Sequence, residues 1–116
     1  MRITEPGLRD RISEAIGDPD SARILHVIRV SPRNAQSISD ETGIPLSSVY
    51  RKLAVLRGTG LAFVKSFQIT PEGKRQENYL SAVTEFRVVV SGDQVEFELI
   101  PSDESAHRLW FKLFNS

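Results

Sequence analysis

The sequence predicts a single α+β domain in which several short helices come first and two β-hairpins follow. Apolar residues recur every three or four positions up to Leu56 and at alternate positions after Gly60, so the period changes from helix to strand. The 116-residue length suits one domain. With 40% hydrophobic and 26% charged residues, the composition is typical of a globular protein that buries a core.

Two helices are expected before residue 31. Thr4 and Pro6 resemble the start of the first helix, with Thr4 as N-cap and Pro6 in the first turn. Asp18 is the expected N-cap of the second helix, with Pro19 at its first position. The apolar residues expected to face the core from these helices are Leu8, Ile12, Ala15, Ile16, Ala22, Leu25, Val27 and Ile28.

A tight turn separates two further helices, expected over residues 35–41 and 46–56. Asn34 is the N-cap of the former, and Gly43 lies where the chain must turn with positive φ, which glycine adopts at little cost. The apolar positions that hold the two helices together are Ile38, Ile44, Val49 and Leu53. This pattern predicts a helix-turn-helix.

Two hairpins and a last helix complete the prediction. Strands over 61–69 and 75–83 surround a turn at 70–74, and a second hairpin alternates apolar and polar residues on both sides of a turn at 91–94. After Pro101, a terminal helix concentrates large apolar side chains, which exceed what one side of a short helix buries alone. We expect a homodimer through this helix, the second hairpin or both, with the first helix able to contribute. The residues of the terminal helix expected to take part are Leu109, Trp110, Leu113 and Phe114.

This order of elements predicts a winged helix-turn-helix, with a three-helix core and a β-hairpin wing, plus a second β-hairpin and a C-terminal helix. Residues 18–83 are the expected DNA-binding core within the single domain 1–116, and residues 84–116 the expected dimerisation region. Helix 46–56 is then the element that enters the major groove, while the wing over 61–83 contacts the DNA backbone.

The helix-turn-helix segment resembles the ArsR-type transcriptional regulators, in particular their archaeal branch. The resemblance rests on the residues from Ile38 to Pro45 and from Ser47 to Leu53, followed by Leu56, Gly60 and Leu61, and it is strong over residues 18–83. It implies binding to double-stranded DNA as a homodimer. Metal-sensing members of this family use Cys or His clusters, whereas this chain has no cysteine and two distant histidines, so no metal and no cofactor are expected. Ser39 stands where the family usually has alanine, and its hydroxyl therefore needs a hydrogen-bond partner.

The candidate DNA contacts are polar and basic residues of the helix-turn-helix and the wing. An exposed arginine on the recognition helix can bridge two acceptors of a guanine, and basic side chains at a wing tip suit phosphates. The candidates on helix 46–56 are Ser47, Ser48, Tyr50, Arg51 and Lys52; those at the wing tip are Lys74 and Arg75; and those for further backbone contacts are Gln36, Ser37 and Lys65. On an arbitrary helix such residues would be read as a solvated face.

The alternative is a winged helix used as a protein–protein interaction module in a transcription-related assembly. An enzyme is not expected, because no nucleophile–base pair, metal cluster or phosphate loop is recognisable. Glu85, Glu96 and Glu98 are expected on a solvated or inter-subunit sheet face. No apolar signal-peptide core and no membrane span are visible, so a cytoplasmic location is expected.

The formal net charge is zero, with 15 basic and 15 acidic residues, and this total argues against a nucleic-acid partner. Its distribution argues the other way. Residues 46–75 contain six basic side chains and one acidic side chain, whereas residues 76–116 contain three basic and seven acidic ones. Positive charge is therefore concentrated on the proposed recognition helix and wing.

Overall fold

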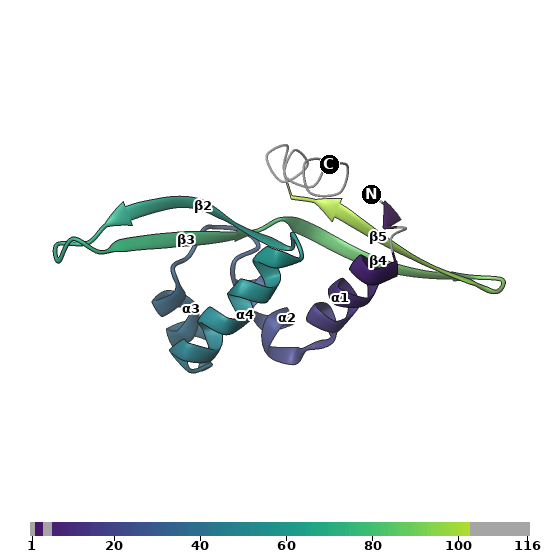
Figure 1. Cartoon of the computed structure of the whole chain (residues 1–116), viewed down its shortest axis with the longest axis horizontal. Coiled ribbons are helices and arrows are strands. Elements are labelled where there is room, and N and C mark those ends of the chain that lie inside the picture. Colours follow the sequence, from purple (N-terminus) through teal and green to yellow (C-terminus); the bar gives the residue numbers. More distant parts are fainter. Residues whose placement is uncertain (1, 4–5, 103–116) are drawn as a thin grey trace.

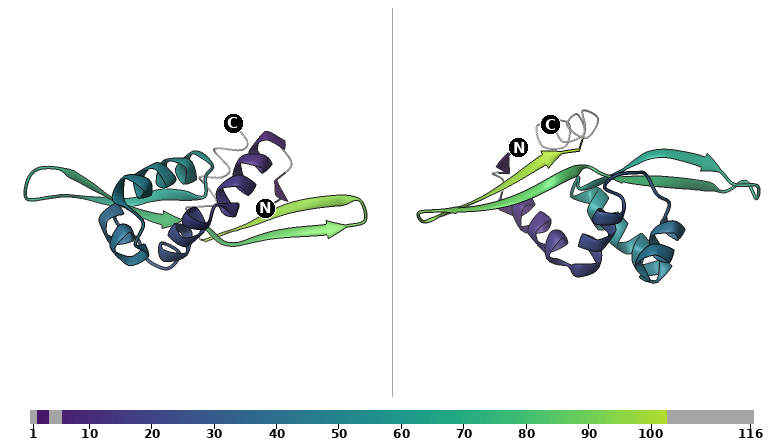
Figure 2. Two further views of the ribbon diagram at one scale, coloured as in Figure 1. Left: turned by 90° about the horizontal axis from the view of Figure 1, so that it is seen from below. Right: turned by 180° about the vertical axis from the view of Figure 1, so that it is seen from behind.

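The computed structural model of the chain describes residues 2–3 and 6–102. Four helices lie on one side of a long ribbon made by two hairpins, which extend in opposite directions from the helices (Figures 1 and 2). The helices are α1 Pro6–Gly17, α2 Pro19–Val27, α3 Ala35–Thr42 and α4 Leu46–Gly58, and the strands are β1 Arg2–Ile3, β2 Ala62–Ile69, β3 Arg75–Ser81, β4 Val83–Ser91 and β5 Gln94–Pro101. This α+β arrangement fits a winged helix fold.

The helix boundaries follow the capping residues of the sequence. The Asp18 carboxylate accepts a hydrogen bond from the Ser21 amide at 3.0 Å, and Pro19 occupies the first turn of α2. The Asn34 side chain accepts from the Ser37 amide at 2.8 Å. Both caps satisfy amides that have no partner inside the helix, and both were predicted from sequence.

The core lies between the helices and the bases of both hairpins. The fully buried apolar side chains include Ile12, Ile24, Ile28, Ile38, Val49, Leu53, Leu56, Leu61 and Leu99. One expectation for α2 was wrong: Ala22 is exposed, whereas Ile24 is buried. The buried positions are residues 21 and 24 of α2 and its C-cap, residue 28, which recur at the helical spacing and place position 22 on the outer side.

The first hairpin and the second are separate sheets joined at a buried residue, Ala82. The expected strand over 75–83 is therefore divided, because the chain crosses here from one sheet to the other. The Ser81 amide donates to the Ile28 carbonyl at 2.9 Å and the Ala82 amide donates to the Leu61 carbonyl at 2.8 Å. The first bond ties the end of β3 to the residue that follows α2, and the second closes the base of the first hairpin.

The second sheet has the strand order β1-β5-β4. The two-residue strand β1, which no period in the sequence indicates, pairs with β5 through Arg2 opposite Glu98 and Ile3 opposite Phe97. The predicted terminal helix, with Leu109, Trp110, Leu113 and Phe114, and the predicted cap Thr4 lie outside the described residues. Within the described ranges, no helix is long and apolar enough to cross a membrane.

Candidate nucleic-acid interface

Helix α4 has one buried side and one exposed side. Val49, Leu53 and Leu56 pack into the core, so Ser47 and Arg51 point away from it into solvent. Tyr50, which is 54% exposed, lies on the side of the helix nearer the wing. An exposed helical surface of this kind is what the major groove of B-DNA admits.

The turn before α4 is held by short hydrogen bonds. Gly43 has φ of 78° and ends α3 in the left-handed conformation. The Ser39 hydroxyl donates to the Ile44 carbonyl at 2.6 Å, which supplies the partner that the sequence required. The Thr42 hydroxyl donates to the Ile38 carbonyl at 2.7 Å and accepts from the Ile44 amide at 3.2 Å. The angle between α3 and α4 is thus fixed by both side chains and backbone.

Arg51 and Lys52 are neighbours in sequence but lie in different environments. Arg51 is exposed and donates to the Ser48 hydroxyl at 3.1 Å; within the described part of the chain it has no carboxylate partner. Lys52 is half-buried on the α2 side, with its Nζ atom 2.9 Å from an Asp18 carboxylate oxygen. The hydrogen bond from Lys52, together with that from Ser21, lowers the pKa of Asp18 to about 2. Successive residues point about 100° apart around a helix, so the two cations do not share a face.

The wing hairpin β2–β3 presents its basic residues beside the turn. The Thr70 amide donates to the Lys74 carbonyl at 2.8 Å, and Gly73 adopts φ of 81° within this turn. Lys74 is exposed, and the Arg75 guanidinium carbon lies 3.7 Å from the centre of the Phe67 ring. This cation–π contact orients Arg75 without neutralising it. Lys65 is exposed on β2, nearer the base of the wing.

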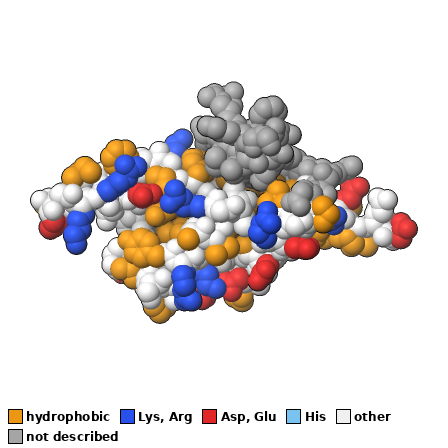
Figure 3. Space-filling model, in the orientation of Figure 1, with side chains coloured by type: hydrophobic (Ala, Val, Ile, Leu, Met, Phe, Trp, Pro, Cys, Tyr) orange, Lys and Arg blue, Asp and Glu red, His pale blue; other side chains and the backbone are white. Residues whose placement is uncertain are grey.

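Acidic side chains around the site are partly neutralised by basic ones. Glu77 on β3 lies 3.7 Å from Arg57 and 4.0 Å from Arg75, and Glu41 on α3 lies 2.7 Å from Arg33. Figure 3 shows Lys and Arg side chains along the β2–β3 hairpin and Asp and Glu side chains toward the tip of β4–β5. The uneven charge distribution of the sequence therefore becomes a separation in space.

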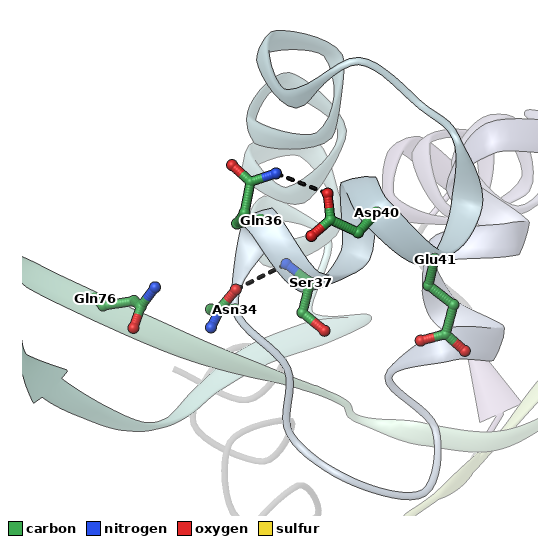
Figure 4. A pocket seen from close by; sticks show the side chains of 6 residues that line it. All are labelled: Asn34, Gln36, Ser37, Asp40, Glu41 and Gln76. Carbon is green, nitrogen blue, oxygen red and sulfur yellow. Dashed lines mark hydrogen bonds between the residues drawn. The ribbon is translucent and has the colours of Figure 1, made fainter.

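Polar side chains line a hollow between the start of α3 and strand β3 (Figure 4). Its volume is about 490 Å³, and its lining residues are Asn34, Gln36, Ser37, Asp40, Glu41 and Gln76. The side-chain amide of Gln36 donates to the Asp40 carboxylate at 2.9 Å, and the hydrogen bond between Asn34 and Ser37 lies at the N-terminus of α3. The backbones of Arg33 and Tyr79 exchange hydrogen bonds at 3.0 and 2.8 Å, which hold this end of α3 against the wing.

Four of the ten candidate residues meet at a second hollow, of about 370 Å³, between α3, α4 and the wing. These are Gln36, Tyr50, Lys74 and Arg75. Ser47 and Arg51 lie on the adjacent exposed face of α4, whereas Ser48 is half-buried and Lys52 is turned toward α2.

Sequence reasoning did not select Gln76 or Arg33, which border this region. Gln76 accepts from the Gln68 side chain at 2.8 Å across the wing, and its place at the start of β3, two residues after Lys74, was the available signal. For Arg33 no local signal existed, because its position depends on the bridge to β3. Among the described residues, no group of three or more His, Cys, Asp or Glu side chains is placed to hold a metal ion.

No protein-family model matches the chain, and no curated protein is similar to it in sequence. Among solved structures it is similar to the homodimeric winged helix-turn-helix DNA-binding domain of Mb0332 from Mycobacterium bovis, a possible ArsR-family transcriptional regulator. The identity is 17%, the match covers 93% of this chain and 76% of that one, and the TM-score is 0.48. NolR from Sinorhizobium fredii is 14% identical over 99% of this chain and 95% of its own, with a TM-score of 0.48. HlyU from Vibrio cholerae is 15% identical over 96% of both chains, with a TM-score of 0.46.

Proposed function

We propose that this protein is a sequence-specific transcriptional regulator that binds double-stranded DNA as a homodimer. Helix α4 reads the major groove, and the β2–β3 wing contacts the backbone. Residues 18–83 form the DNA-binding core and residues 84–116 the dimerisation region. The proposal places the chain in the archaeal branch of the ArsR-type regulators, on the strength of the helix-turn-helix residues from Ile38 to Leu53, and in the cytoplasm, as expected of a DNA-binding regulator.

The observation that carries the proposal is the exposed position of Arg51 on α4. Its guanidinium stands on the exposed side of α4, and its one described hydrogen bond is to the Ser48 hydroxyl. Arg51 could therefore bind the edge of a guanine without breaking an ion pair with any carboxylate of the described residues. Two parallel hydrogen bonds to guanine O6 and N7 are the commonest specific contact of an arginine with DNA.

The remaining candidates have supporting roles in this proposal. Lys74 and Arg75 contact phosphates on one side of the groove, and the side chains of Gln36 and Ser37 do so from the start of α3, where the helix dipole favours an anion. Ser47, Ser48 and Tyr50 contact bases or backbone beside Arg51. Lys65 contacts the backbone from the base of the wing. The ion pair of Lys52 with Asp18 makes Lys52 the weakest of the ten candidates.

The experiment that tests the proposal is selection of bound fragments from random duplex DNA, followed by titration of the selected duplex at several salt concentrations. We expect a palindromic consensus, because a dimer with twofold symmetry reads two half-sites. If each protomer neutralises about three phosphates, the slope of log K against log salt is about −5 for the dimer. Failure to enrich any sequence, with binding that does not depend on salt, would refute the proposal and favour the protein-interaction module.

A further inference from the structure

The β4–β5 hairpin has a continuous apolar face that the helices cover only in part. The register places Phe86 opposite Leu99, Val88 opposite Phe97 and Val90 opposite Val95, so these six side chains share one face. At the base Leu99 is fully buried and the rings of Phe86 and Phe97 stack with their centres 5.7 Å apart. Toward the tip Val95 is 43%, Val88 50% and Val90 72% exposed.

The outer halves of the two hairpins differ in their cross-strand partners and in the position of their bulges. In β2–β3 the large apolar residues of the outer half lie opposite charged ones: Phe67 opposite Glu77, and Ile69 opposite Arg75. A bulge between Val64 and Ser66 also interrupts β2. Charges and bulges are the means by which proteins prevent a sheet edge from pairing with another chain. The outer half of β4 has neither, since its bulge lies at the base, between Val83 and Glu85.

Strand β4 is an edge strand. In the order β1-β5-β4 it has β5 on one side, and among the described residues no strand pairs with its other side. Its outer half contains three consecutive valines, residues 88–90, and Val89 is 42% exposed on the opposite face from its two neighbours. Exposed β-branched residues on both faces suit a neighbouring strand, which covers both, better than a helix, which covers one.

The charges of β4 favour a second copy of the same strand. Its two charged residues neutralise each other, because the Arg87 guanidinium donates to both carboxylate oxygens of Glu85, at 2.8 and 3.2 Å. In an antiparallel pair centred on Val88, Arg87 would lie opposite Val89 of the second copy and Glu85 opposite Ser91. No like charges would then face each other, whereas a pair centred on Arg87 would oppose two arginines.

The direction of the hairpin agrees with this pairing. Helix α1 packs on the apolar face of the second sheet, where Arg9 lies 4.6 Å from the centre of the Phe97 ring, and the four helices lie on that side of the ribbon (Figure 1). A twofold axis perpendicular to the sheet at Val88 keeps the helices of both copies on the same side. In each copy the wing points away from β4–β5 (Figure 2). This pairing would therefore place the two wings at the outer ends.

We propose that the outer edge of β4 pairs antiparallel with β4 of a second copy, so that the two second sheets join into one across a twofold axis at Val88. This inference rests on the proposed homodimer and names where its protomers meet. It does not depend on DNA, and all of its tests are done without DNA.

The test uses the absence of cysteine from the chain. The variant Val88→Cys places two thiols opposite each other at the axis, and under mild oxidation it should form a disulfide-linked dimer on a non-reducing gel. The matched control is Val30→Cys, since Val30 follows α2 and is 81% exposed. Its crosslinking should be at least about tenfold slower, because only random encounters bring its thiols together.

Sedimentation of the full chain supplies the second measurement. We expect wild type and Val30→Lys to sediment as dimers and Val88→Lys as a monomer, because paired lysines at the axis repel. Circular dichroism checks that the lysine variants are folded. If Val88→Lys does not fold, the comparison of Val88→Cys with Val30→Cys crosslinking decides the question. A wild-type dimer with no preferential Val88→Cys crosslink overturns the β4 interface but leaves the homodimer intact. A wild-type monomer at about 50 μM overturns both.

Discussion

Replacing Arg51 by alanine should weaken binding to the selected duplex by about 1–3 kcal/mol, the contribution of a good bidentate contact with a guanine. This corresponds to a roughly 5- to 150-fold rise in Kd. The full contribution is expected because Arg51 is exposed and its described contact is a 3.1 Å bond to a neutral hydroxyl. Little has to be broken before the guanidinium reaches a base.

The adjacent Lys52 is the matched control. Its ammonium group is 2.9 Å from an Asp18 carboxylate oxygen, on the side of α4 that faces α2. To contact DNA it would have to give up this ion pair, so Lys52→Ala should change Kd by less than about threefold, within the range of a surface charge change. Two substitutions that each remove one positive charge from one helix thus have different expected effects.

The assay is fluorescence anisotropy of labelled duplex, with the selected sequence and a scrambled one measured in parallel. Arg51→Lys adds a third comparison, because lysine retains the charge but not the planar fork. It should keep the affinity for scrambled DNA and lose most of the preference for the selected sequence. The reasoning is refuted if Arg51→Ala binds the selected duplex as wild type does, or if Lys52→Ala loses more affinity than Arg51→Ala.

Three further predictions concern the scaffold of the site. Gly43→Ala should destabilise the fold by about 1–2 kcal/mol in urea unfolding, because the residue has φ of 78° and the added Cβ meets no atom within 4 Å, which leaves backbone conformation as the cost; an unchanged midpoint would contradict this. Ser39→Ala should cost about 1 kcal/mol in the same assay through loss of the bond to the Ile44 carbonyl, and a stabilised variant would count against that bond. The pKa of Asp18 is lowered from 3.8 to about 2 in the folded protein, so its contribution is present above pH 3.8 and is lost as the pH falls toward 2. Asp18→Asn keeps a capping oxygen but has no carboxylate to titrate, so its stability should fall less steeply than that of wild type over this interval. Parallel curves would show that the pKa of Asp18 is not lowered in the folded protein.

Local signals in the sequence were sufficient where a structural feature depends on a few neighbouring residues. Asp18 and Asn34 cap their helices because each has a side-chain oxygen that accepts from the amide three residues later, an interaction that involves only neighbouring residues. Gly43 ends α3 because glycine adopts the left-handed conformation easily, which is also a property of one position in the sequence. The buried side of α4 also follows from spacing alone, since Val49, Leu53 and Leu56 recur at the helical period.

Features that depend on packing between elements were not accessible in this way. The side of α2 that faces the core could not be chosen correctly from its apolar residues, because Ala22 and Ile24 both qualify and only contact with the other helices decides between them. The two-residue strand β1 has too few residues to show alternation. The environment of Lys52 depends on how close α2 comes to α4. Its sequence position beside Arg51 therefore did not reveal that only Lys52 pairs with Asp18.

The two hairpins show why periodicity alone does not assign a function to a strand. Both alternate apolar and polar residues, and the sequence predicts both equally well. Their cross-strand partners differ on one face: the outer wing sets Phe67 against Glu77, whereas the second hairpin sets Val90 against Val95 there and Val89 against Glu96 on its other face. Register is a property of the paired strands, and it converts similar alternating sequences into one charged surface and one apolar edge. The zero net charge of the whole chain is therefore compatible with two hairpins of different surface character.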